Sequence, residues 1–283
     1  MTGSGTPASL QEIQMTNRTA ESSVQHHLND GQPLGQSALA ANRSIRTASL
    51  TAGVGLLLIS ALAGFGNFVA LRGLVTEWNA AQTATDIMAS NGLFRLGILS
   101  LFLTVALDIV VAWALYHVFR PVNNGISMLA AWFRTAYAAV FMVGIGQLIG
   151  VLRLLGNDDY LRVFSGDQLH AQALLGFDSF NDIWYASLVL FGLHLLVVGY
   201  LAYRSGYVPR FLGVLLGIAG LGYVIDSFGV VLSRGSWTDV SFITFIGEFL
   251  FALWLVIWGR RISVGTSRFH DDQVEQPTEQ VAG

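Results

Sequence analysis

The chain has 283 residues, of which 53% are hydrophobic and only 12% are charged, and its formal net charge is −3. Soluble domains carry about 25% charged residues, so a water-soluble fold of this length could not cover its surface with so few. The small net charge gives no reason to expect a nucleic-acid partner, and the absence of cysteine excludes disulfides, thiolate metal sites and a cysteine nucleophile.

Six apolar runs follow a polar N-terminal tail, residues 1–46, that we expect to be disordered. At about 1.5 Å per residue, each run is long enough to cross about 30 Å of hydrocarbon. The chain ends in an acidic tail, residues 263–283, that we also expect to be disordered. The sequence therefore predicts an all-α membrane domain over residues 47–262, embedded in the lipid bilayer, with spans at 49–71, 93–119, 125–152, 180–203, 209–232 and 240–259.

The placement of arginine predicts the orientation of these spans. Positive residues are enriched in cytoplasmic loops. If the N-terminus is cytoplasmic, the inner flanks and loops hold Arg43, Arg46, Arg120, Arg204, Arg210, Arg260, Arg261 and Arg268, whereas the outer loops hold Arg72, Arg95, Arg153, Arg162 and Arg234. This bias favours an orientation with both termini in the cytoplasm.

Two charged residues of the second and third runs lie at a similar depth. Asp108 precedes Arg120 by twelve residues, and Arg134 follows Asn124 by ten, so both stand roughly 15–18 Å from the cytoplasmic face. Because a short turn joins the two runs, their helices should be antiparallel neighbours. We predict a buried ion pair that offsets two insertion costs of about 2.5–3.5 kcal/mol each. Our preferred interpretation is a structural role, and the alternative is a direct role in transport or catalysis.

A second group of polar residues is predicted in the outer half of the membrane. Asp226 and Glu248 lie near the outer ends of the last two runs without an obvious basic partner. Asn67, Arg95 and Gln147 fall in the same outer half. We expect these five side chains to line an outward-facing polar cavity. The alternative is that each acid snorkels or caps a neighbouring helix on its own.

The remaining features are a buried histidine and two small-residue motifs. His194 lies mid-membrane in the fourth run and is expected to contact a neighbouring helix, since no second histidine or H-x-x-E pattern suggests a metal site. Gly146-x-x-x-Gly150 and Gly213-x-x-x-Gly217 allow helix backbones to approach closely, and such faces are also candidate contacts between copies of the chain. We find no catalytic motif and predict neither a cofactor nor a metal.

Several segments resemble one membrane-protein family. They are FRLGILSLFLTVALDIVVAWALYHVFRPVN from Phe94, AAWFRTAYAAV around Arg134, and LHLLVVGYLAYRSGYVPRFLGVLLGIAGLGYVIDSF from Leu193. Taken together and in this order along the chain, these segments resemble the bacterial membrane family called domain of unknown function 4386. The resemblance rests on Arg95, Asp108, Pro121, Arg134, His194, Gly199, Tyr200, Arg204, Ser205, Gly206, Pro209 and Asp226. It implies a six-span domain in a bacterial inner membrane and supplies no substrate or catalytic residue.

The sequence leaves three functional interpretations open. The leading one is a transporter-like or small-ligand-binding membrane protein that uses the outer polar group, with an unknown ligand. The first alternative is a structural or regulatory membrane component that acts through helix contacts. The second is a membrane-embedded enzyme acting on a lipid-like substrate.

Overall fold

A computed structural model describes residues 42–156, 159–233, 240 and 245–262. Residues 45–263 form one compact unit, and the two chain ends, 1–44 and 264–283, form a second. The predicted tails therefore lie outside the described residues, except for residues 42–46, which are helical. Apart from residues 42–44 at its start, the helix bundle belongs entirely to the unit of residues 45–263.

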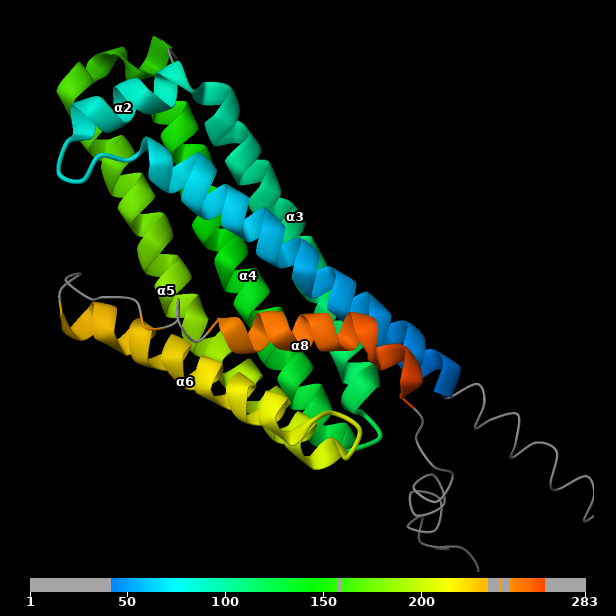
Figure 1. The fold of residues 1–283 in the computed structure, drawn as a ribbon. Helices are drawn as coiled ribbons and strands as arrows, with labels where there is room; N and C mark the ends of the chain where they lie inside the picture. Colours follow the sequence, from blue (N-terminus) through cyan, green and yellow to red (C-terminus); the bar gives the residue numbers. More distant parts are fainter. Residues whose placement is uncertain (1–41, 157–158, 234–239, 241–244, 263–283) are drawn as a thin grey trace, which may run out of the picture. The chain divides into compact units, whose positions relative to one another are not determined.

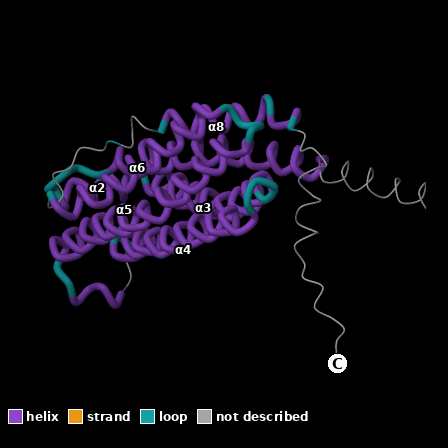
Figure 2. Tube along the Cα trace, turned by 90° about the horizontal axis from the view of Figure 1, so that it is seen from below, coloured by secondary structure: helices purple, strands orange, loops and turns teal. Residues whose placement is uncertain are grey.

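Five helical segments are long and apolar enough to cross a membrane, namely Asn42–Leu74, α3 (Asn91–Phe119), α4 (Asn124–Leu154), α5 (Gly166–Ser205) and α6 (Arg210–Leu232) (Figure 1). The first segment consists of an α-helix over residues 42–64, a π-helix η1 (Phe65–Leu71) and a 3-10 turn η2 (Arg72–Leu74). We call residues 42–64 the first helix. The described residues contain no strand (Figure 2), so the predicted all-α membrane fold class is confirmed.

The last predicted span differs from a complete membrane-crossing helix. Within residues 240–259, the structure describes α8 (Ile246–Ile257), which has 12 residues. A helix of this length covers about 18 Å, which is less than the hydrocarbon thickness. Residues 241–244 of this run lie outside the described part of the chain. The described residues thus hold five candidate spans and one shorter apolar helix.

Helices α5 and α6 pack backbone against backbone. A Cβ on Gly192 would lie 2.6 Å from the carbonyl oxygen of Gly220, and one on Gly199 would lie 2.7 Å from that of Gly213. Further along, the Ser227 hydroxyl donates to the Tyr185 carbonyl over 2.8 Å. These contacts define an antiparallel pair. At these glycines there is no room for a side chain between the two helices.

The two small-residue motifs behave differently. Gly213 and Gly217 both lie against Gly199 of α5, so this motif brings helix backbones together as predicted. Gly146 and Gly150 of α4 face no atom within 4 Å in the described part of the structure. The first motif therefore does not contribute to packing within this unit.

The first helix lies antiparallel to both α3 and α8. Next to α3, a Cβ on Gly66 would collide with the Ser100 hydroxyl. Next to α8, the Ser49 hydroxyl donates to the Leu255 carbonyl over 3.4 Å, and the Arg46 Nε donates to the Ile262 carbonyl over 3.1 Å. The start of the first helix and the end of α8 therefore lie together at one end of the unit. Counting back along α8 places its first turn beside the last turns of the first helix, where Ile59, Ser60 and Ala63 line the same cavity as Glu248.

Capping side chains mark where α4 and α5 begin. The Asn123 side chain accepts a hydrogen bond from the Ile126 amide over 2.9 Å, which starts α4 directly after the turn from α3. Ser165 and Gln168 form a capping box at the start of α5. This helix has 40 residues and is about 60 Å long, so it extends beyond the hydrocarbon. A short amphipathic helix, α2 (Ala80–Ala89), packs against it.

Candidate functional site

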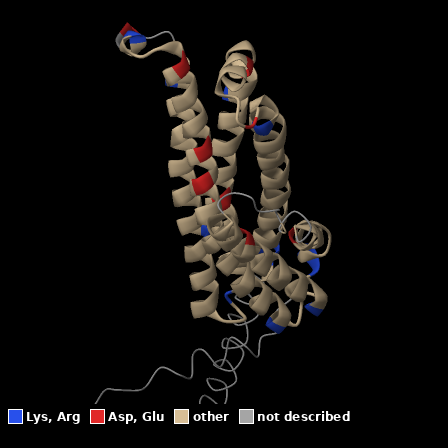
Figure 3. Ribbon diagram, turned by 90° about the vertical axis from the view of Figure 1, so that its left-hand side faces the viewer, with Lys and Arg blue, Asp and Glu red and all other residues tan. Residues whose placement is uncertain are grey.

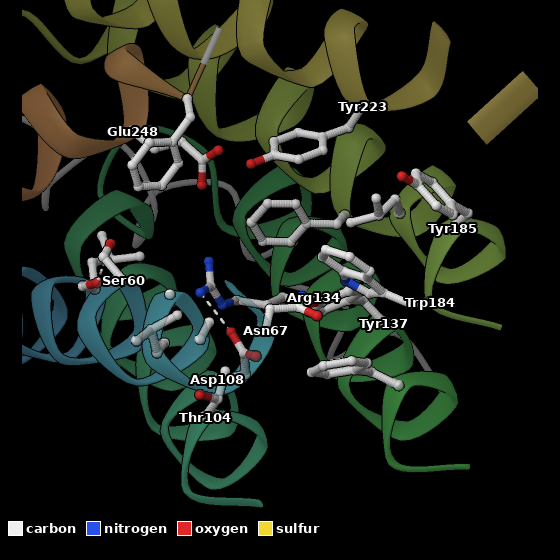
Figure 4. A pocket seen from close by; sticks show the side chains of 18 of the residues that line it. Ser60, Asn67, Thr104, Asp108, Arg134, Tyr137, Trp184, Tyr185, Tyr223 and Glu248 are labelled. Carbon is white, nitrogen blue, oxygen red and sulfur yellow. Dashed lines mark hydrogen bonds and ion pairs between the residues drawn. The ribbon is translucent and has the colours of Figure 1, made fainter. Parts of the chain in front are cut away.

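A cavity of about 480 Å³ lies in the middle of the unit, between the first helix, η1, α3, α4, α5, α6 and the start of α8. Its volume is in the range of small-molecule sites, which are about 300–1,000 Å³. Most of its wall is apolar or aromatic. Its charged and amide side chains are Asn67, Arg72, Asp108, Arg134 and Glu248, four of which are buried (Figure 4).

The ion pair between α3 and α4 forms one wall. The Arg134 Nη2 atom donates to Asp108 Oδ1 over 2.6 Å, and both residues are 1% exposed. The tight turn after α3 makes the two helices antiparallel neighbours, so the two side chains reach the same depth, as expected from the residue count. Both residues also line the cavity, whereas the sequence suggested a polar cavity apart from them.

His194 connects this pair to α5. Its Nδ1 lies 2.8 Å from the Ala130 carbonyl oxygen, and its Nε2 lies 3.3 Å from Arg134 Nη1. Because a guanidinium can only donate, Nε2 is the acceptor, and the proton sits on Nδ1 and is donated to the carbonyl. Asp108, Arg134 and His194 thus form a buried hydrogen-bonded chain across α3, α4 and α5. His194 acts here by holding Arg134 in position.

Glu248 lies in the first turn of α8 and is 8% exposed. The Tyr223 hydroxyl of α6 points toward it (Figure 4). Glu248 Oε1 has no hydrogen-bond partner among the described residues.

Aromatic rings form a continuous second wall. Phe191 lies at its centre, with ring centroids 5.2 Å from Tyr223 and 4.8 Å from Tyr137. The wall continues through Phe141, 5.8 Å from Tyr137, to Trp184, 6.4 Å from Phe141. The guanidinium carbon of Arg134 lies 5.3 Å from the Phe191 centroid, which is within the range of a cation–π contact. The ion pair and the aromatic wall therefore meet at this ring.

Four buried polar atoms on the charged and amide side chains of the wall have no hydrogen-bond partner among the described residues: Asn67 Oδ1, Asp108 Oδ2, Arg134 Nε and Glu248 Oε1. They belong to η1, α3, α4 and α8. Leaving a buried polar group unsatisfied costs about 1–3 kcal/mol, and native proteins leave few such groups. All four atoms belong to residues that line one cavity, so its wall can offer hydrogen bonds to a polar molecule.

The polar group expected from the sequence is only partly assembled. Asn67 and Glu248 reach the cavity, but Arg95, Gln147 and Asp226 do not line it. Arg95 is exposed, and its Nε donates to Asn91 within the same helix. The expectation that all five side chains line one cavity is therefore corrected: only Asn67 and Glu248 do so.

The physical reasons lie in helix rotation and length. Asp226 is fully buried, and its Oδ1 accepts a hydrogen bond from the Val240 amide over 2.8 Å, so it binds the chain beyond α6. Gln147 is half-buried on α4, on the side whose backbone approaches Gly176 of α5. Glu248 reaches the cavity from the first turn of α8, which begins at Ile246, whereas the sequence predicted one continuous span from residue 240.

Sequence reasoning missed the tyrosines, Trp184 and η1. In an apolar run, a tyrosine or tryptophan is typical of the hydrophobic core, so Tyr137, Tyr223 and Trp184 gave no separate signal. The π-helix turns Asn67 toward the cavity; π segments frequently occur at functional sites. In the sequence, Gly64 just before η1 and Gly66 within it were the only residues that pointed to an irregular helix here. Among the described residues, no three His, Asp or Glu side chains are grouped so that they could hold a metal.

These features define a polytopic α-helical membrane protein with a polar, aromatic-walled cavity within its helix bundle. The chain belongs to the family described as Domain of unknown function (DUF4386), whose model matches residues 51–259. It is 38% identical over 166 residues to an uncharacterized protein of the archaeon Archaeoglobus fulgidus, covering 59% of this chain and 85% of that protein. The family therefore extends beyond bacteria. No solved structure shows a significant match to the chain.

Proposed function

We propose that this protein binds a small amphipathic molecule in its mid-membrane cavity. The observation that carries the proposal is the convergence of four buried, unpartnered polar atoms from η1, α3, α4 and α8 on one hollow. The aromatic wall supplies apolar contact area, and the polar atoms supply orientation, a combination typical of ligand sites.

A purely structural role for the ion pair explains less of the site. A structural pair is expected to have its remaining hydrogen-bonding positions satisfied by protein groups, because each unsatisfied group weakens it. Here Asp108 Oδ2 and Arg134 Nε are left without partners among the described residues. Glu248 adds a third such group on a helix that the Asp108–Arg134 pair does not involve. Ligand binding therefore explains these unpartnered atoms, whereas a purely structural ion pair does not.

The test is a thermal-shift screen of small amphipathic compounds against purified protein in lipid nanodiscs. Ala63 lines the cavity on the first helix, and Ala61 is exposed on the same helix. We expect hits that stabilise the wild type and the Ala61→Phe variant but not Ala63→Phe, in which the new ring occupies the cavity. If every hit shifts all three proteins equally, the cavity is not the binding site and the proposal fails.

We further propose that the chain crosses a bacterial inner membrane six times with both termini in the cytoplasm. Five long helices alternate in direction, so residue 232 and residue 45 lie at opposite ends. The Arg46–Ile262 hydrogen bond brings the chain back to the starting end, which supports a sixth crossing within residues 233–262. Most of the basic residues drawn in Figure 3 gather at that same end, as the positive-inside rule requires.

Because the chain has no cysteine, single introduced cysteines can test this topology. Trp78 is 97% exposed in the turn before α2, and Gly125 is exposed at the turn between α3 and α4. A membrane-impermeant maleimide should label Trp78→Cys in intact cells. It should label Gly125→Cys only after permeabilisation. The reverse pattern would refute the proposed orientation.

A further inference from the structure

We infer that the ligand of this cavity is an amphipathic organic amine with a ring-sized apolar body, which enters from the bilayer. The inference rests on the proposed function, and it assigns the chemical class that the cavity selects. Three observations carry it: the inventory of unpartnered atoms, the distribution of charge and the exposure of the cavity wall.

The unpartnered atoms demand a hydrogen-bond donor. Three of the four, Asn67 Oδ1, Asp108 Oδ2 and Glu248 Oε1, are acceptors, and only Arg134 Nε is a donor. An ammonium group offers three donors and no acceptor. A carboxylate or phosphate ligand would bring further acceptors and would leave these oxygens unsatisfied. The inventory therefore favours an amine over an anion.

The distribution of charge in the cavity wall also favours an amine. Arg134 is already bound to Asp108, whereas Glu248 has no ion pair in the described part of the chain. Arg72 does not neutralise Glu248: its guanidinium rests on the rings of Phe68 and Trp184, 5.4 and 5.9 Å from their centroids, at the outer end of η1. An ammonium beside Glu248 would provide the missing opposite charge.

The walls fit the rest of such a molecule. Tyr223 points toward Glu248 (Figure 4) and, with Tyr137 and Trp184, presents aromatic surface to the cavity. Aromatic rings attract cations within about 6 Å of the centroid and also pack against apolar rings. The cationic end and the apolar body of one ligand can therefore both be accommodated.

The exposure of the wall indicates the route of entry. The α3 and α4 charges are almost fully buried, but Phe68 of η1 is 52% exposed and Phe245, just before α8, is 36% exposed. Both residues line the cavity at the level of the apolar spans. Exposed apolar rings at this level of a membrane-spanning unit are expected to contact lipid, so we infer that a molecule dissolved in the bilayer enters the cavity between them.

The experiment compares three probes of similar size in zwitterionic nanodiscs: 2-phenylethylamine, 2-phenylethanol and 3-phenylpropanoate. Binding to the purified full-length protein is measured by saturation-transfer NMR with competition. We expect saturable binding of the amine, at least tenfold weaker binding of the alcohol and none of the carboxylate. Glu248→Gln should weaken amine binding at least tenfold. Asp226→Asn, which changes a buried carboxylate outside the cavity wall, should not.

Each outcome has a defined meaning. Equal binding of amine and alcohol, preferred binding of the carboxylate, or undiminished amine binding by Glu248→Gln would overturn the amine assignment. If none of the probes binds while the compound screen yields hits that Ala63→Phe abolishes, the assignment also fails, but the proposed binding function stands. If Glu248→Gln does not fold, the probe series on the wild type still decides the chemical class. In that case Ala63→Phe, paired with Ala61→Phe, shows whether binding occurs in the cavity.

Discussion

Breaking the ion pair from one side should destabilise the protein more than removing both charges. In Asp108→Leu, the buried Arg134 guanidinium keeps only the Nε2 atom of His194 and the ring of Phe191. In Arg134→Met, the Asp108 carboxylate loses its only ion-pair partner among the described residues. Each single change leaves one uncompensated buried charge, which costs about 3–5 kcal/mol.

The double variant should be much less affected. With both charges gone, the main remaining loss is the hydrogen bond to His194, and its unsatisfied nitrogen costs about 1–3 kcal/mol. The two single costs together exceed the double cost by at least about 3 kcal/mol. Reversible unfolding in mixed SDS and dodecylmaltoside micelles would measure the three free energies of unfolding. Additive effects, with a coupling below about 0.5 kcal/mol, would refute the reasoning.

Four further variants, one of them a control, test the packing of the bundle by the same unfolding assay. Gly199→Ala should cost about 1–3 kcal/mol because its Cβ meets a backbone carbonyl of α6 at 2.7 Å; Gly146→Ala, with nothing within 4 Å, should change stability little. Asn123→Ala removes the cap of α4 and should cost about 1 kcal/mol. His194→Ala should destabilise by about 2–5 kcal/mol through two lost hydrogen bonds and a cavity, and it should also weaken ligand binding because Arg134 loses its support.

The sequence was sufficient for features that depend on length and local turns. The long helices were predicted from the apolar runs. The proximity of Asp108 and Arg134 was predicted because a tight turn makes α3 and α4 antiparallel neighbours. Depth along a helix can be counted from residue numbers. The close approach at Gly213 likewise followed from residue size.

Features that depend on rotation about the helix axis could not be read in this way. Asp226 and Glu248 carry the same charge and lie in consecutive apolar segments, yet one binds the Val240 amide and the other faces the cavity. His194 could be assigned to mid-membrane depth but not to Arg134, because α5 can present any of its faces to α4. The late start of α8 and the π-turns of η1 are backbone irregularities. Apolar composition does not distinguish them from continuous α-helix.

The close backbone contacts between α5 and α6 at Gly192–Gly220 and Gly199–Gly213 affect how the protein can accommodate ligands of different size. At these two points backbone meets backbone, so a rotamer change cannot widen the contact, and the two helices form a rigid half of the cavity wall. Any adjustment falls to the opposite half, where the seven residues of η1 can tighten into ordinary helix. Such a change would slide Asn67 and Phe68 relative to the fixed aromatic surface. Tolerance for ligand size is therefore expected to be a property of the N-terminal segment alone.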